Sequence, residues 1–230
     1  MNIEQVKTAL HSLSSIIKDK RSLNVGIAYT ETFIPSSVYV IEPLRAICSA
    51  SDEIRFEHML KGLGSDPLDV ERKMNELYNF VTDEDRAFFV SDCFRKTLLS
   101  QTPIVCCIMG LILADINSKT ISINQHDAII MNAITNFTDN DIRNFYDITS
   151  GQYTVNASDN KYIEEQLFPS QARTDYNLTV DLCCQNRIFS KTFWVDDNGS
   201  GHLNAVTYGE VAVTLRNYIT RARRQLQYGK

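Results

Sequence analysis

The side chains best able to ligate a metal or attack a substrate are the four histidines and six cysteines. The histidines are His11, His58, His126 and His202, and the cysteines are Cys48, Cys93, Cys106, Cys107, Cys183 and Cys184. No histidine pair has the spacing of a zinc motif, and CxxC does not occur. Because adjacent cysteines do not easily bridge each other, we expect buried, reduced thiols and a cytoplasmic protein. No cofactor and no metal site is predicted.

Motifs for phosphate binding or nucleophilic catalysis are equally weak. Gly62-Leu63-Gly64 has the GxG spacing, but it lacks the third glycine of a dinucleotide site and the lysine of a P-loop. We interpret it as a helix end followed by a turn. No GxSxG nucleophile elbow is present. A non-enzymatic protein is therefore favoured, and the alternative is an enzyme whose site is assembled from scattered residues.

The charge balance argues against a protein that wraps nucleic acid, since 23 Lys+Arg stand against 28 Asp+Glu. Many of the acids lie between Asp66 and Asp92, mostly where helices are predicted to begin. The helix dipole stabilises acids in a first turn, so helix capping is the favoured role. An acidic docking face for a basic partner is the alternative.

Apolar periodicity and capping residues predict a mainly α-helical chain. Residues 2–19 repeat apolar positions at steps of three and four, unlike a secretion signal. Residues 51–150 read as consecutive helices with short connections, and a compact bundle would bury their apolar faces. The predicted helix starts are Ser51, Asp66-Pro67, Thr82-Asp83, Thr102-Pro103, Ser122 with Gln125, and Thr138 with Asp141. In the helix that begins at Asp66-Pro67, the residues predicted to face inward are Leu68, Val70, Met74, Leu77, Tyr78 and Val81. In the helix that begins at Thr82-Asp83, they are Phe88, Phe89, Cys93, Phe94 and Leu98. Residues 23–40 show no helical period, and a short helix is expected near 43–50.

The most apolar stretch runs from Pro103 to Ala114. It is about a dozen residues long, whereas a membrane-spanning helix needs about 20. We expect a central buried helix with Ile104, Ile108, Leu111 and Ile112 in the bundle core, and no membrane partner.

The polar, turn-rich stretch 149–160 is interpreted as a linker, which divides the chain into a helical bundle domain, 1–150, and a second domain, 151–230. In the second domain we expect a short helix over 159–167 and a longer one over 171–186. A strand over 187–195, a turn and a strand over 202–206 follow, and a last helix begins near 207–210. The predicted fold is a mainly α multi-helix bundle followed by a small α+β unit.

This order of elements over about 159–227 resembles a winged-helix domain, the helix-turn-helix variant with a β-hairpin wing. Asn186-Arg187-Ile188-Phe189 stands where such domains leave the second helix for the wing. The segment Ala205-Val206-Thr207-Tyr208-Gly209-Glu210 resembles the turn that closes the wing. The resemblance implies DNA binding through the second helix in the major groove, or protein docking. Here that helix carries Arg173 against two acids, Asp175 and Asp181, so it offers little cationic surface to phosphates, and protein docking is favoured.

These observations predict a regulatory or protein-interaction protein acting within a larger assembly or as a homo-oligomer. Helical proteins of this size without motifs are common among bacterial and phage accessory proteins, including those of phage–host conflict. A DNA-binding regulator is the alternative. The candidate interaction residues are Trp194, Arg216, Arg221, Arg223 and Arg224. Strand alternation puts Phe193 and Val195 on one face and Trp194 on the other, so Trp194 is either an exposed binding anchor or a core residue.

Overall fold

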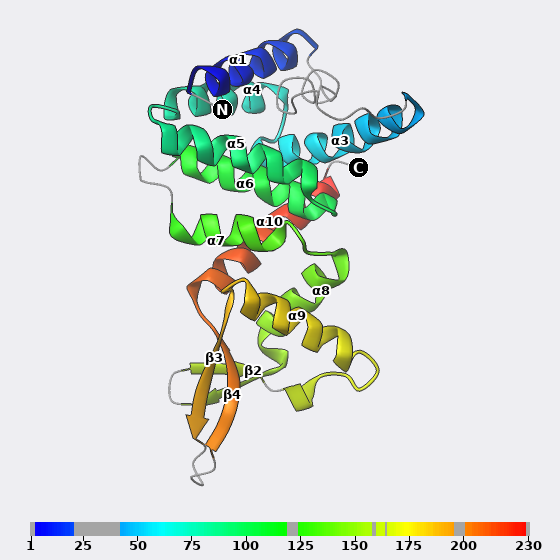
Figure 1. The fold of residues 1–230 in the computed structure, drawn as a ribbon, viewed down its shortest axis with the longest axis vertical. Coiled ribbons are helices and arrows are strands. Elements are labelled where there is room, and N and C mark those ends of the chain that lie inside the picture. The colour runs from blue at the N-terminus through cyan, green and yellow to red at the C-terminus, as the bar shows by residue number, and fades with distance from the viewer. Residues whose placement is uncertain are drawn as a thin grey trace. The chain divides into compact units, whose positions relative to one another are not determined.

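The computed structural model describes residues 3–20, 42–118, 124–157, 160–163, 165–195 and 201–228. It is mainly α-helical with a small antiparallel sheet, which confirms the predicted fold class (Figure 1). The contacts group the chain into two units, Met1–Asn124 with Arg221–Lys230, and Gln125–Thr220. The sequence placed the division at 150/151 instead, because only the polar stretch after residue 148 looked like a linker. Residues 125–150 group with the sheet that follows them.

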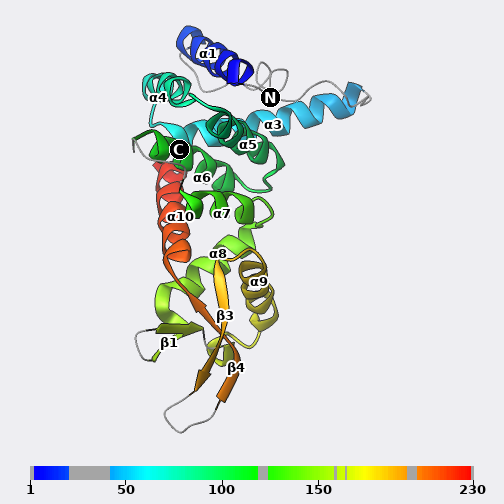
Figure 2. The same ribbon diagram turned by 60° about the vertical axis from the view of Figure 1, so that its left-hand side comes forward.

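The first unit is a helical bundle. Its helices are α1 (Ile3–Lys20), α3 (Glu42–Leu63), α4 (Pro67–Phe80), α5 (Glu84–Leu99), α6 (Pro103–Ser118) and the C-terminal part of α10 (Glu210–Tyr228). Helix α1 lies along α4, and α6 contacts α3, α4 and α5. Figure 2 shows the helices of this bundle from a second side. The two predicted helices at 43–50 and 51–62 form one continuous helix, α3. The irregular segment predicted over 23–40 lies outside the described residues.

Acidic residues begin two of these helices, as predicted. The Asp66 side chain accepts hydrogen bonds from the backbone N–H groups of Leu68 (3.0 Å) and Asp69 (2.9 Å). The Asp83 side chain accepts one from the N–H of Arg86 (2.9 Å). These bonds satisfy donors that have no partner inside the helix. The local sequence therefore fixes where α4 and α5 start.

Helix α6 is buried on all sides. Ile108, Leu111 and Ile112 are buried, and Ile104 is half-buried at the start of the helix. The prediction that this helix forms the bundle core is confirmed. Among the helices of the described ranges, none combines the length and the apolar character needed to cross a membrane.

Three residues predicted to face the core instead face solvent. The exposed fractions are 74% for Leu68, 39% for Tyr78 and 69% for Phe88. Consecutive helical residues point about 100° apart, so of the adjacent Phe88 and Phe89 only Phe89 reaches the core. The apolar faces predicted for α4 and α5 from the sequence are therefore wider than the faces that the structure buries.

Two glycines allow α3 and α6 to pack closely. A Cβ atom on Gly62 would lie 2.0 Å from the Cys107 carbonyl oxygen, and one on Gly110 would lie 2.0 Å from the Met59 carbonyl oxygen. Gly62 was predicted only as part of a helix end. The structure shows that it is also the point where the α6 backbone meets α3.

The second unit combines helices with a four-stranded antiparallel sheet. Its elements are α7 (Gln125–Ile134), α8 (Asp139–Asp147), a π-helical turn η1 (Ile148–Gln152), β1 (Thr154–Ala157), β2 (Asn160–Ile163), a 3-10 turn η2 (Glu165–Leu167), α9 (Arg173–Gln185), β3 (Phe189–Val195), β4 (Gly201–Tyr208) and the start of α10. The strand order is β1-β2-β4-β3. The described part of 51–150 thus holds six helices, α3 to α8, as many as the predicted helix starts, although α3 begins before Ser51.

Two predictions in this unit are wrong. The linker expected over 149–160 contains η1 and β1, and the helix expected over 159–167 is replaced by β2 and η2. Strand β2 pairs along its whole length with β1, and its Tyr162 and Ile163 also pair with Thr207 and Val206 of β4. The β4 partner lies more than 40 residues away in the sequence, so no local pattern indicated that this segment joins the hairpin sheet. Helix α9 and the β3–β4 hairpin are confirmed, and the hairpin turn at 196–200 lies outside the described residues.

The core of this unit joins α8, α9 and β3. The rings of Phe145 and Phe189 stack with centroids 5.6 Å apart. The buried Asn144 amide donates to the Thr179 hydroxyl (3.2 Å), and that hydroxyl lies 3.0 Å from an Asp141 carboxylate oxygen. Asp141 also closes the predicted capping box with Thr138 at the start of α8. One acid thus caps α8 and holds α9 against it.

Candidate functional site

The predicted interaction residues lie on two elements, β3 and α10. Trp194 is on β3, where its backbone pairs with His202 of β4, just after a register shift in the ladder. Its side chain lies outside the described residues, so its exposure stays a prediction. The four arginines lie on α10, where Arg216 belongs to the second unit, and Arg221, Arg223 and Arg224 belong to the first.

The Arg221 side chain is held by an acid of its own chain. Its two terminal nitrogens donate to the two carboxylate oxygens of Asp115 on α6, at 2.6 and 2.9 Å. This two-pronged geometry suits a guanidinium and a carboxylate. Among the predicted interaction arginines of the first unit, Arg221 is therefore paired within the chain, Arg223 is half-buried and Arg224 is exposed.

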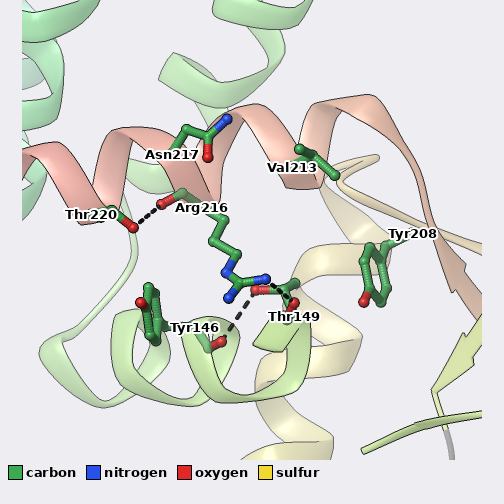
Figure 3. A pocket seen from close by; sticks show the side chains of 7 residues that line it. All are labelled: Tyr146, Thr149, Tyr208, Val213, Arg216, Asn217 and Thr220. Carbon is green, nitrogen blue, oxygen red and sulfur yellow. Dashed lines mark hydrogen bonds between the residues drawn. The ribbon is translucent and has the colours of Figure 1, made fainter. Parts of the chain in front are cut away.

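Arg216 reaches a pocket of the second unit. Its Nη1 donates to the Thr149 carbonyl oxygen (2.6 Å), and its guanidinium carbon lies 5.3 Å from the centre of the Tyr146 ring. Figure 3 shows the side chain extending from α10 toward Thr149, with the Tyr146 ring on one side and the Tyr208 ring on the other. The guanidinium is thus held in one orientation by a hydrogen bond and a cation–π contact.

The Arg216 pocket has a volume of about 310 Å³. Val213, Asn217 and Thr220 of α10 complete the wall made by Tyr146, Thr149, Tyr208 and Arg216. No acid is among these lining residues. The pocket therefore offers a fixed positive charge, aromatic surface and one amide, which is a set of groups that suits a small anion.

A second hollow lies between α9 and β3. This α9–β3 groove has a volume of about 520 Å³, and Asp181, Gln185, Arg187 and Lys191 are among its lining residues. Lys191 Nζ lies 3.5 Å from an Asp181 carboxylate oxygen, and both side chains are largely exposed. Its mixed charges give the groove no strong preference for anions or cations.

The exposed side of α9 borders this groove. The helical spacing puts Thr174, Asp175, Leu178, Asp181 and Gln185 on one side of the helix, and all five are exposed. We call this set the α9 face. Leu178 in its centre is 62% exposed. A large apolar side chain between two carboxylates is a surface that suits a protein partner better than a phosphate backbone.

The cysteines do not form a reactive site in the part of the chain that is described. Cys93, Cys106, Cys107 and Cys183 are buried, as predicted, Cys184 is half-buried, and these five form no disulfide with one another. Burial raises the pKa of the Cys106 and Cys107 thiols to about 12, so these thiols stay protonated at neutral pH. The side chain of Cys48 lies outside the described residues.

The histidines are scattered through the structure. Within the described ranges, no group of three or more His, Cys, Asp or Glu side chains could hold a metal ion. His58 on α3 has its pKa lowered by burial and by the nearby Lys61. Its Nδ1 is buried and has no hydrogen-bond partner among the described residues.

Sequence reasoning identified Arg216 but missed its surroundings. Tyr146, Thr149 and Tyr208 come from α8, η1 and β4, and no spacing in the sequence connects them with an arginine on α10. The signal in the sequence that could have indicated a partner was the position of Arg216 on an apolar helix face, because an arginine there needs a partner near that face.

Comparison with known proteins does not identify the chain, since no family model, no curated protein and no solved structure matches it.

Proposed function

We propose that this chain is a non-enzymatic protein-interaction protein whose second unit binds a protein partner through the α9 face. The observation that carries the proposal is the exposure of Leu178, 62%, between Asp175 and Asp181. Exposed leucine side chains that lie beside a groove supply the apolar contact on which protein interfaces depend. Asp181 belongs both to the α9 face and to the groove lining, so the two form one continuous surface.

The strand order supports the winged-helix character of this unit. Strand β4 of the hairpin lies between β3 and β2, and β2 precedes α9 in the chain. A strand that joins the hairpin sheet and precedes the second helix in the chain, as β2 does, is compatible with the winged-helix arrangement. In that arrangement α9 takes the position of the recognition helix, and the proposal assigns to it a protein surface.

DNA binding is the second candidate, because Arg173, Arg187 and Lys191 are exposed on or near α9. Two observations weigh against it. Asp175 and Asp181 would face the phosphates together with these cations, and Lys191 is already close to Asp181.

We further propose that the chain is an accessory protein of a bacterium or phage and that it acts in a reducing cytoplasm. The cysteines that the structure describes form no disulfide with one another, which supports the reducing compartment.

The test is a comparison of Leu178→Asp with Leu68→Asp. Both leucines are exposed on helices, so neither change should disturb the fold. The partner is captured from an extract of the source organism, identified, purified and titrated, and the solution mass is measured to detect a second copy of this chain. We expect L178D to weaken binding by roughly tenfold or more, since a central apolar contact contributes about 2 kcal/mol. L68D and the conservative L178M should bind as the native protein does.

Two results would contradict the proposal. One is equal partner affinity in L178D and the native protein. The other is tight binding to duplex DNA at low salt that falls steeply as salt is added and is unaffected by L178D. The fluorescence of Trp194, the only tryptophan, gives a further readout. A blue shift with the protein partner, and none with DNA, is expected if the indole is exposed.

A further inference from the structure

We infer that the Arg216 pocket is a binding site for a small aromatic anion, a flat ring that carries one carboxylate or phosphate group. The first support is the fixed orientation of the Arg216 guanidinium. Its bond to the Thr149 carbonyl (2.6 Å) and its position over Tyr146 (5.3 Å) fix its plane in the pocket wall. A guanidinium has five N–H donors, and the bond to Thr149 uses one of them. The others can serve an oxyanion with two parallel hydrogen bonds.

The remaining polar groups of the wall narrow the choice of ligand. The Thr149 hydroxyl lies 2.8 Å from the Phe145 carbonyl oxygen, and the Thr220 hydroxyl donates to the Arg216 carbonyl oxygen (2.9 Å). These hydroxyl protons therefore serve the helix backbone. Donors for a ligand come from Arg216 and from the exposed amide of Asn217. Because the lining residues that the structure describes include no carboxylate, an anion meets no like charge from them.

The aromatic part of the ligand follows from the rings and the volume. Tyr146 has one face turned to the guanidinium, whereas the Tyr208 ring stands on the other side of the Arg216 side chain (Figure 3). Tyr208 and the Val213 side chain offer a surface on which a flat ring can pack. A volume of about 310 Å³ lies at the lower end of the range for small-molecule pockets. It suits one or two fused rings with a single charged group, and excludes a long chain.

The inference does not depend on the α9 face. The pocket is lined by α8, η1, β4 and α10, and it shares no lining residue with the α9–β3 groove. L178D should bind a pocket ligand as well as the native protein does, so the two proposals can fail separately.

In the experiment, the full chain is titrated with small-molecule probes, and binding is monitored by NMR of the backbone amides or by calorimetry. The probes are benzoate and adenosine 5′-monophosphate, which distinguish carboxylate from phosphate recognition. Benzamide and adenosine test the rings without the charge, and acetate and inorganic phosphate test the charge without the ring. We expect at least one charged aromatic probe to bind roughly tenfold or more tightly than its neutral and its ringless counterpart.

Two variants test the site. Asn217→Asp adds a negative charge to an exposed position in the wall, and should weaken binding by roughly tenfold or more without changing the thermal midpoint. Arg216→Gln should abolish binding, whereas Arg173→Gln, a surface arginine of the same unit, should leave it unchanged. If R216Q does not fold, N217D alone decides. Failure of both charged aromatic probes to bind, or equal affinity in N217D and the native protein, would overturn the inference.

Discussion

At the scale of single residues, two glycines decide how closely α3 and α6 can approach. Gly62 lies against the Cys107 carbonyl and Gly110 against the Met59 carbonyl, so each helix fits where the other has no side chain. In both positions the obstructing atom is backbone, which cannot rotate away as a side chain can. A methyl group must therefore push the helices apart.

We predict that Gly62→Ala and Gly110→Ala each lower the free energy of unfolding by about 1–3 kcal/mol or more, since both overpack a close helix contact. A better helix propensity offsets less than about 1 kcal/mol of this cost. Urea denaturation measures the change. Gly209→Ser is the control, because a Cβ there meets nothing within 4 Å and serine is favoured directly before a helix. Native-like stability of G62A and G110A would show that the two helices are not in close contact.

At the scale of elements, helix α6 carries the core of the first unit. It is apolar on every side, and its neighbours α3, α4 and α5 bury it. Helices α4 and α5 differ from it because each has a solvent side, on which Leu68 and Phe88 lie.

Truncation of Leu111 to alanine should lower the free energy of unfolding by about 2–5 kcal/mol, because the side chain is buried and its removal leaves a cavity. Leu99→Ala is the matched control. Leu99 also lies on a helix of the first unit, but it is 64% exposed, so the change should stay within about 0.5 kcal/mol. Equal effects of the two substitutions in thermal or urea unfolding would contradict the buried position of α6.

At the scale of the whole molecule, the buried thiols of both units couple stability to alkaline pH. Burial raises the pKa of Cys106 and Cys107 to about 12, and raises the pKa of Cys93 and Cys183 as well. The folded protein therefore keeps protons that the unfolded chain releases above about pH 9. When the folded state binds more protons, the free energy of unfolding falls as pH rises.

We expect this loss between about pH 9 and 12, with full stability below pH 9 as far as the thiols are concerned. Each such thiol contributes about 1.4 kcal/mol per pH unit within that window. Cys106→Ser should reduce the slope of stability against pH by about this amount, because serine does not ionise and its hydroxyl can serve the Thr97 carbonyl that Cys106 contacts. Tyrosines and lysines also titrate at alkaline pH, but they are the same in both proteins. The difference between the two slopes therefore reports the Cys106 thiol. Identical slopes would show that Cys106 is accessible to hydroxide in the folded protein.

Local interactions let the sequence by itself determine the helix starts at Asp66, Asp83 and Thr138, the buried α6 and the β3–β4 hairpin. Caps, apolar periodicity and short turns act over a few residues, so the sequence displays them directly. Only the tertiary structure decided that residues 160–163 join β4 in one sheet, that Phe88 faces solvent, and that Gly62 meets Cys107. It also decided that Arg221 pairs with Asp115, 106 residues away, and that Arg216 enters a pocket with Tyr146 and Tyr208. These outcomes depend on which distant segments pack together, and no spacing in the sequence records that choice.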